Sequence, residues 1–261
     1  MLRLFRLFLR MVSLTIQREL AHRVNLFFQA TLALTQVAAG LAALSVIYTH
    51  VNTLAGWTAA QATILLGIYE IVSGLLLAFI EPNLAFFSNK IYGGELDDLL
   101  LQPAPSLFTA SFSTCQPWAL AEVGLGILIV GLSVPHLGSI PTAGGIVAAL
   151  LLLLVGIVIM WASRVLLASL AFWAQGLELS VLYSGWWQLG RYPISIYPGP
   201  IRWVLTYIVP VAFIATFPAY ALSHPFDPLL LAGGAAAALG ALVAVRLVWR
   251  AALRRYTSAT S

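Results

Sequence analysis

Charged residues are scarce in this chain. Asp, Glu, Lys and Arg make up 8% of its 261 residues, whereas apolar residues make up 61%. Soluble domains carry about 25% charged and about 45–50% apolar residues, so this composition is typical of a membrane protein. The alternative is a large soluble protein with an unusually apolar core. It is disfavoured because apolar runs long enough to span a bilayer recur along the chain.

Cysteine and lysine are almost absent. The single cysteine, Cys115, excludes a disulfide within the chain and a cysteine-based metal site. The single lysine, Lys90, is not part of a P-loop motif, so the chain has no P-loop with which to bind ATP. The four histidines are scattered, and HExxH, GxSxG and CxxC motifs are missing. We therefore expect no catalytic residues, no metal site, no cofactor bound by this chain and no enzyme activity.

Long apolar segments are what the sequence does have. Six of them reach the length of about 20 residues that a helix needs to cross a bilayer. They are 24–48, 58–80, 107–133, 142–168, 201–222 and 228–249. The sequence thus predicts an all-α polytopic membrane protein with a single transmembrane domain over 1–261, a six-helix bundle over 24–249 and a tail over 250–261. Pro210 and Pro218 predict a kink or a break in the fifth span.

Basic residues are distributed unevenly between the connections. The loops 49–57, 134–141 and 223–227 contain no Lys or Arg. Basic residues occur instead in the N-terminal segment, in 81–106, in 169–200 and in the tail. By the positive-inside rule both termini are cytoplasmic. Arg164 falls within a span, near its cytoplasmic end, where we expect it to extend to the interface. This clustering at the ends of apolar runs argues against a nucleic-acid-binding surface.

Residues 1–20 differ from the spans. As a helix, Arg3, Arg6 and Arg10 fall on one face, and leucine and phenylalanine side chains fall on the opposite face. This pattern predicts an amphipathic helix that lies in the membrane interface. A secretory signal peptide is disfavoured because arginine interrupts the apolar run, and an Arg-rich organellar transit peptide is the remaining alternative.

Two carboxylates are predicted within the membrane. Glu70 lies in the second span and Glu122 in the third. Because a carboxylate is costly inside a bilayer, each is a candidate functional residue. The simpler interpretation is that each is protonated or hydrogen-bonded to a neighbouring helix.

The sixth span is rich in small residues. Four of them are Gly233, Gly234, Ala237 and Gly240. Small residues let helices approach closely, so this face is expected to pack against another helix.

The stretch GGELDDLLLQPAP, residues 93–105, concentrates acid in one place. It holds three of the nine carboxylates of the chain within four positions. A short helix over 94–102 is predicted, because acidic residues favour a helix N-terminus and Pro103 ends it. Its two faces consist of the leucines Leu96, Leu99 and Leu100 and the acids Glu95, Asp97 and Asp98. Acidic side chains are repelled by the negative inner leaflet, so this helix is expected to bind a soluble protein.

Taken together, the six spans, the basic N-terminal helix and the short acidic helix resemble the permease subunits of type-2 ATP-binding-cassette exporters. Three stretches are more closely similar to the bacterial "ABC-2 family" permeases of largely uncharacterised export systems. They are GWTAAQATILLGIYEI (56–71), IYGGELDDLLLQPAPSLF (91–108) and RYPISIYPGPIRWVLTYIVPVAFIATFPA (191–219). The resemblance covers residues 56–220, which is most of the chain.

The resemblance implies several roles. Residues 1–20 would be the family's elbow helix, and loop 81–106 would carry its coupling helix, with Gly94–Leu100 and Pro103 as the contact to separate ATPase subunits. The stretch 169–200 would be a second cytoplasmic connection, in which Arg191, Tyr192 and Pro193 are candidate contacts. ATP and Mg²⁺ would bind to the partner, and a second permease subunit would complete the path. Any re-entrant element would lie around residues 217–222.

These features predict a permease of an ATP-driven exporter in the bacterial plasma membrane, which works by alternating access. The alternative function is a self-sufficient proton-coupled transporter that uses Glu70 and Glu122. A membrane enzyme that acts on lipid is disfavoured because no catalytic cluster is present.

Overall fold

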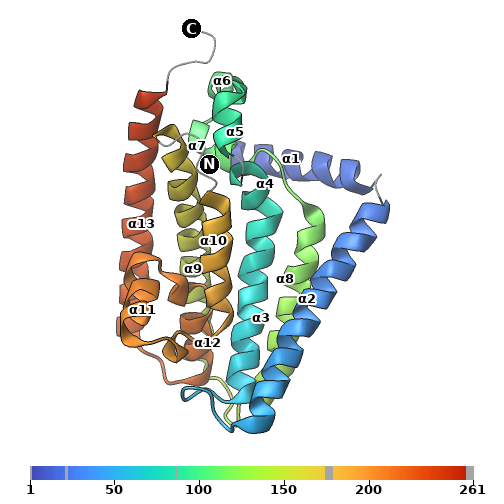
Figure 1. The fold of residues 1–261 in the computed structure, drawn as a ribbon, viewed down its shortest axis with the longest axis vertical. Coiled ribbons are helices and arrows are strands. Elements are labelled where there is room, and N and C mark those ends of the chain that lie inside the picture. Colours follow the sequence, from blue (N-terminus) through green and yellow to red (C-terminus); the bar gives the residue numbers. More distant parts are fainter. Residues whose placement is uncertain (1, 21–22, 86, 174–178, 257–261) are drawn as a thin grey trace.

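The computed structural model describes residues 2–20, 23–85, 87–173 and 179–256. Over these residues the chain is helical and contains no β-strand. Figure 1 shows a bundle of long helices with α1 (Leu2–Leu20) lying across one end. We call this end the α6 end, because α6 (Glu95–Leu101) projects from it beside the last turns of α13 (Pro228–Arg255). The opposite end, which carries the connections 51–58, 137–142 and 224–227, is called the loop end.

Five helices are long and apolar enough to cross a membrane in the described part of the chain. They cover Leu26–His50, Ala59–Ile91, Pro117–His136, Ala143–Phe172 and Pro228–Arg255. The underlying elements are α2 (Arg23–His50), α3 (Ala59–Leu75), α8 (Leu120–Ser133), α9 (Ala143–Ser169) and α13. Both α1 and the last turns of α13 lie at the α6 end (Figure 1). The two described ends of the chain are therefore on the same side of the bundle.

Side-chain caps fix where three of these helices begin. The Thr58 hydroxyl accepts a hydrogen bond from the Gln61 backbone amide, and the Thr58 backbone amide donates to the Gln61 side-chain oxygen, which makes a capping box at α3. Thr142 caps α9 through the Gly145 amide, and Asp227 caps α13. All three caps lie at the loop end. A polar residue before each apolar run satisfies amides that have no partner within the helix.

The third predicted span, 107–133, is not one helix. The chain forms α7 (Ser106–Phe112), breaks over 113–116, and resumes in η2 (Pro117–Ala119) and α8. The membrane-crossing part therefore begins at Pro117. The break occurs because residues 113 and 114 bind the side chain of Asn83 and leave the helical hydrogen-bond pattern.

The fifth predicted span, 201–222, is not a continuous helix either, so six continuous spans are not confirmed. Its pieces are α11 (Gly199–Trp203), the π-helical turn η7 (Val204–Ile208), η8 (Val211–Phe213) and α12 (Thr216–Ser223). Pro210 has no amide hydrogen and displaces Val209 from helical geometry, as the sequence suggested. The segment enters the bundle and returns to the loop end. Ser195 near its start donates to Ala55 in the α2–α3 connection, and Ala221 near its end lies beside Gly145.

The chain reaches the loop end before segment 201–222 begins. It runs there through α10 (Leu179–Gln188) and η5 (Leu189–Arg191). Along this piece, Trp187 donates to Ser73, and the backbone then passes Tyr69 at Gly190. The contacted residue of α3 moves from Ser73 back to Tyr69 as the chain advances from Trp187 to Gly190. This piece therefore lies antiparallel to α3. The described part of 169–200 therefore runs through the bundle. The expectation that this stretch is a cytoplasmic connection is wrong for residues 183–200.

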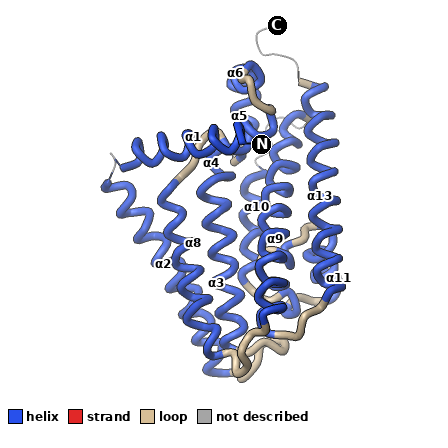
Figure 2. Tube along the Cα trace, turned by 180° about the vertical axis from the view of Figure 1, so that it is seen from behind, coloured by secondary structure: helices blue, strands red, loops and turns tan. Residues whose placement is uncertain are grey.

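The closest helix pair is α3 with α8, which lie side by side in both views (Figure 2). A Cβ added at Gly126 would lie 2.5 Å from the carbonyl oxygen of Gly67, and one added at Gly74 would lie 2.9 Å from that of Ala119. Glycine is therefore required at this crossing, as in other membrane helix pairs whose backbones touch.

The small residues of α13 behave differently from the expectation. A Cβ at Gly234 would lie 3.0 Å from Leu152, so this glycine packs closely against α9. Nothing lies within 4 Å of a Cβ placed at Gly233 or Gly240. The predicted helix contact is therefore made by Gly234, and Gly233 and Gly240 face open space.

The α3–α8 crossing yields a stability prediction. Replacing Gly126 by alanine should destabilise the protein by about 1–3 kcal/mol, because the new methyl group forces the two backbones apart. Thermal unfolding of the detergent-solubilised chain would measure the change. Gly124→Ala on the same helix is the matched control, since nothing lies within 4 Å of its Cβ position. Equal melting temperatures for the two variants would contradict the assigned contact.

Candidate functional site

The acidic stretch of the sequence forms a projecting helix at the α6 end (Figure 1). It is preceded by α5 (Phe87–Tyr92) and begins after Gly94, whose φ of 78° is accessible to glycine at little cost. It ends at Leu101, and Gln102 is extended because Pro103 follows. The helix predicted over 94–102 is thus present as α6.

The leucines of α6 face in different directions. Leu96 is fully buried within the chain, and the partly buried Leu99 packs against the same core. Leu100 is 39% exposed and Leu101 is 83% exposed. The expectation that Leu96, Leu99 and Leu100 form one outward surface is therefore wrong. The helical spacing of Leu96 and Leu99 correctly identified an apolar face, but that face packs on the chain's own core. The exposed leucines of α6 are Leu100 and Leu101.

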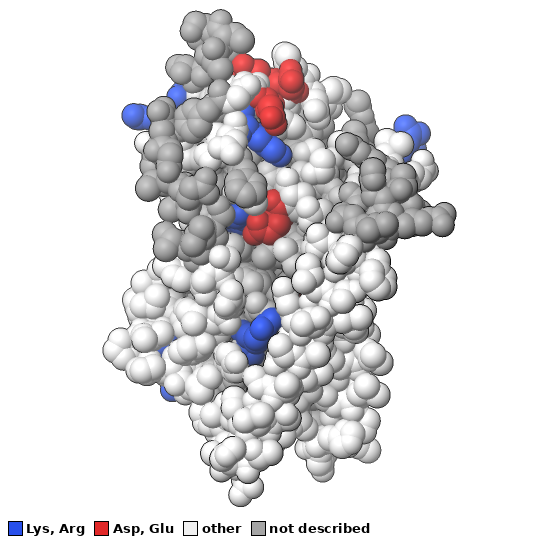
Figure 3. All heavy atoms as spheres, turned by 45° about the vertical axis from the view of Figure 1, so that its right-hand side comes forward, with Lys and Arg blue, Asp and Glu red and all other residues white. Residues whose placement is uncertain are grey.

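The acids of α6 lie in the first turns of the helix. Glu95 and Asp98 are exposed, and Asp97 is partly buried. Figure 3 shows acidic atoms only on the upper part of this face, whereas basic atoms occur on both its upper and its lower part. The projecting end of α6 thus combines negative charge with two exposed leucines.

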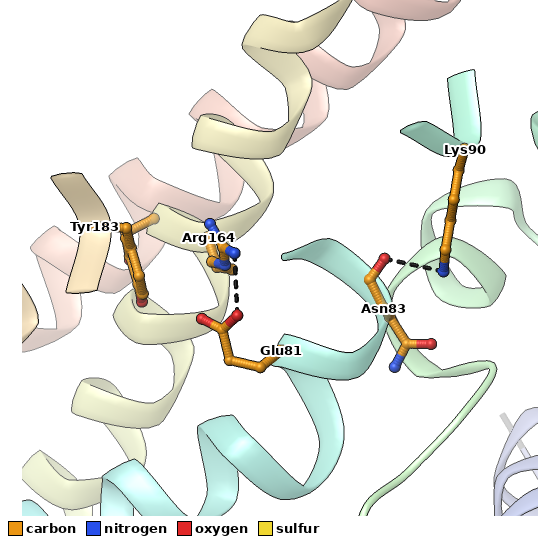
Figure 4. Close-up of polar contacts among 6 residues, drawn as sticks. Glu81, Asn83, Lys90, Arg164 and Tyr183 are labelled. Carbon is orange, nitrogen blue, oxygen red and sulfur yellow. Dashed lines mark hydrogen bonds and ion pairs between the residues drawn. The ribbon is translucent and has the colours of Figure 1, made fainter. Parts of the chain in front are cut away.

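Asn83 anchors the base of the α5–α6 hairpin. It lies in α4 (Glu81–Leu84), which continues α3 through the π-helical turn η1 (Leu76–Ile80). Its buried amide donates to the carbonyl oxygens of Phe79 and Thr114, at 2.8 Å each. Its Oδ1 accepts from Ser113 and from Thr114. Lys90 donates to the Asn83 carbonyl oxygen across 3.2 Å (Figure 4), so one residue joins α4, α5 and the break before α8.

An ion pair lies beside this anchor. Arg164 Nη2 of α9 is 3.0 Å from Glu81 Oε2, and its guanidinium lies 4.8 Å from the centre of the Tyr183 ring (Figure 4). Arg164 is only 2% exposed. The expectation that it extends to the interface is therefore wrong. The carboxylate at the start of α4 supplies a counter-charge inside the bundle, where an unpaired arginine would be very costly.

A second charge cluster lies within the bundle. Glu70 Oε1 of α3 is 3.4 Å from Arg191 Nη2 of η5, and the Arg191 guanidinium lies 5.3 Å from the centre of the Tyr69 ring. Glu122 of α8 is buried at the level of Glu70, because Gly67 and Gly74 of α3 pack against Gly126 and Ala119 of α8. The structure therefore brings together the two intramembrane carboxylates of the sequence analysis, with one arginine between three helices.

This placement also bears on the second candidate contact with a partner, residues Arg191, Tyr192 and Pro193. Arg191 pairs with a carboxylate of α3, Tyr192 packs on the cluster that contains Leu44 and Leu66, and the chain then reaches Ala55 at the loop end. Arg191, Tyr192 and Pro193 thus do not lie with α6 at one end of the bundle. The charge of Arg191 is thus balanced inside the protein, and a contact of these three residues with a partner stays a prediction.

Metal binding finds no support in the described residues, among which no three His, Cys, Asp or Glu side chains form a group that could hold an ion. Cys115 is buried.

Comparison with known proteins agrees with this architecture. The model of the family described as "ABC-2 family transporter protein" matches residues 34–260. The chain belongs to this family. It is a multi-pass membrane protein and a membrane component of transport, and the family is not itself catalytic. No curated protein and no solved structure matches the chain.

Sequence reasoning missed the residues that hold the α6 end together. Glu81 and Arg164 are 83 positions apart, and no periodic pattern links them. Asn83 looked like an ordinary loop residue beside Pro82. The available signal was that Arg164 stood alone within a span, which calls for a carboxylate partner elsewhere in the chain.

The ion pair generates a prediction of stability. Arg164→Met should destabilise the protein by about 3–5 kcal/mol, because Glu81 would remain without its partner. The double variant Arg164→Met with Glu81→Gln should recover part of this loss. Chemical unfolding in detergent measures both, with membrane abundance as a second readout. The single variant Glu81→Gln completes the cycle. If the destabilisation of the double variant equals the sum of the destabilisations of the two single variants, the two side chains are not coupled.

Proposed function

We propose that the chain is the permease subunit of an ATP-driven exporter in the bacterial plasma membrane. It would pair with a second permease subunit and open alternately to the two sides. ATP and Mg²⁺ would bind to separate ATP-binding-cassette ATPase subunits that dock at the α6 end, which would then be the cytoplasmic end. Family membership supports the transport role, and the absence of a P-loop in the sequence requires a partner if ATP drives it.

The observation that carries this proposal is the construction of α6. It projects from the bundle with Glu95, Asp98, Leu100 and Leu101 outward. Its other side is fixed to the core through Leu96, and its base is fixed through Asn83. A docking element needs both properties, because a partner can displace the bundle only through a contact that is itself rigidly attached.

Burial of leucine should dominate the docking affinity. Covering a leucine contributes roughly 1.5–3 kcal/mol, whereas an exposed ion pair contributes about 0–1 kcal/mol. Leu100→Ala combined with Leu101→Ala should therefore strongly weaken co-purification with the ATPase subunit. Asp98→Asn should weaken it less, and mainly at low salt, where exposed charges are least screened. Pull-down from membranes that contain both subunits measures these differences.

Leu229→Ala is a matched control, because Leu229 is 79% exposed but lies at the loop end. It should leave co-purification unchanged. Leu96→Ala should not be used for this test, since that side chain is buried and its loss would disturb α6 itself. If the Leu100 and Leu101 variant retains the ATPase as well as the wild type does, α6 is not the docking helix.

One observation favours the alternative function, a proton-coupled transporter. Two buried carboxylates, Glu70 and Glu122, lie on the closely packed pair α3 and α8, and Arg191 pairs with Glu70, which is an arrangement that could hold and release a proton. If the partner ATPase drives transport, this cluster is needed for packing only. The charge of Glu70 is then balanced by Arg191, and Glu122 requires no proton exchange.

Neutral variants separate the two functions. Under the proposed function, Glu122→Gln in the co-purified complex should retain the wild-type rate of ATP hydrolysis, because glutamine preserves the shape of the side chain. The chain reconstituted alone in vesicles should not dissipate an imposed pH gradient. Rapid dissipation that disappears in both Glu70→Gln and Glu122→Gln would favour the proton-coupled alternative.

A further inference from the structure

A large cavity lies on the side of the bundle formed by α9, α10, η7 and α13. Its volume is about 1150 Å³. Pockets for drug-sized ligands usually measure about 300–1,000 Å³, so this one lies above the usual range. Its lining on α13 includes the small residues Gly233, Ala237 and Gly240, and other elements contribute the aromatic residues Trp186, Tyr207 and Phe213. The open space beside Gly233 and Gly240 is therefore part of this cavity.

The cavity is as long as the apolar layer of a bilayer. Its wall on α13 extends from Asp227 at the start of the helix to Val248. At 1.5 Å per residue this interval measures about 31 Å, and the hydrocarbon core of a bilayer is about 30 Å thick. Trp186, Tyr207 and Leu229 are 49%, 71% and 79% exposed along its margin. The cavity thus opens sideways, toward the surrounding lipid.

Hydrogen bonds within the chain already involve four polar residues of the lining, Ser163, Tyr183, Thr206 and Asp227. Ser163 Oγ lies 2.8 Å from the Met160 carbonyl oxygen and 3.4 Å from the Tyr183 hydroxyl. Thr206 donates to the Arg202 carbonyl oxygen, and Asp227 accepts from the first amides of α13. The backbone amides of the broken segment also find acceptors within it, including Val209 with Val204. The cavity therefore offers a ligand apolar contact and few free hydrogen bonds, which suits a hydrocarbon chain.

Charge is found beyond the end of the cavity at the α6 end. Arg255 follows Val248 by seven residues, which places it two turns further along the same face of α13. It is exposed. Arg255 thus lies about 10 Å beyond the cavity along the helix axis, within reach of the anionic head of an amphiphile whose chain occupies the cavity.

We propose that this cavity binds the hydrocarbon chain of an anionic amphiphile that enters sideways from the bilayer. Such a ligand is selected by the length of the cavity, by its mainly apolar lining, whose carboxylate Asp227 caps α13 at the loop end, and by the position of Arg255. A helix from a second copy of the chain is the competing occupant. Binding here requires no ATPase partner, so it can be tested independently of the proposed function.

The experiment uses the full chain in phosphatidylcholine vesicles that contain a trace of phosphatidylglycerol with a photoreactive group on its acyl chain. Lipid that merely surrounds the protein is diluted by the excess phosphatidylcholine, whereas a specific site concentrates the probe. Labelling of η7 at Tyr207 and Ile208, located by mass spectrometry, should therefore clearly exceed labelling of Leu32 and Leu34. These two leucines of α2 are 55% and 53% exposed and serve as the reference for surrounding lipid.

Filling the cavity should abolish this preference. Gly233→Leu combined with Gly240→Leu places side chains in open space, so folding should be preserved. Labelling of η7 should fall about tenfold, the factor that corresponds to losing the burial of about two methylene groups. Ala236→Leu is the control, because Ala236 is exposed on the same helix but does not line the cavity. Arg255→Gln should lower labelling by the phosphatidylglycerol probe and leave labelling by a phosphatidylcholine probe unchanged.

Three results would overturn the proposal. The first is labelling of η7 no stronger than that of α2. The second is equal labelling by the anionic and zwitterionic probes in the wild-type chain, which would exclude selection of an anionic head. The third is a disulfide between two copies of a Cys115→Ala, Tyr207→Cys variant, accompanied by protection of η7 from the probe. That result would identify a second copy of the chain as the occupant.

Discussion

An arginine buried inside a membrane bundle needs a fixed counter-charge, and the pairing of Arg164 with Glu81 determines how the α6 end is built. Glu81 stands where η1 passes into α4, so the pair sets the position of α9 against the continuation of α3. Asn83, two residues further on, fixes the break before α8. The base of α6 thus depends on the Arg164–Glu81 ion pair and on the buried side-chain amide of Asn83. Ion pairs and hydrogen bonds fix the orientation of the groups that they join, whereas apolar packing does not.

Aromatic packing extends this base toward the cavity. The ring of Phe87 in α5 lies 6.1 Å from that of Phe172 and 5.8 Å from that of Trp249 in α13. Trp249 also donates to Ser106 at the start of α7. Helices α9 and α13 continue from this cluster to form two walls of the cavity. Because protein interiors are close-packed, a displacement of the α5–α6 hairpin must repack these rings, and both cavity walls are attached to them.

Hydropathy predicted the regular spans well and the irregular parts poorly. The span predicted over 142–168 is α9 (Ala143–Ser169), since twenty or more apolar residues leave few alternatives to a helix. Segment 201–222 has the same composition, but Pro210 removes the hydrogen bonds on which a continuous helix depends. The side of the bundle on which Arg191 lies could not be predicted from charge counts, because its partner, Glu70, is 121 residues away. For Leu96, helical periodicity identified a buried face but could not distinguish the chain's own core from that of a partner.

The two sides of the bundle differ in how freely they can change shape. On one side, α3 and α8 touch through Gly67 and Gly126, and any relative sliding would drive side chains into backbone. On the other side, η7 and Pro210 interrupt the helix, and the cavity separates them from α13. Irregular backbone persists at membrane depth only where its polar groups are satisfied locally, as the turn from Val204 to Val209 achieves. The turn is held by hydrogen bonds within itself, whereas the glycine crossing is held by backbone contact between two helices. Movement that follows ligand binding or docking is therefore expected in the broken segment, with α3 and α8 as the fixed frame.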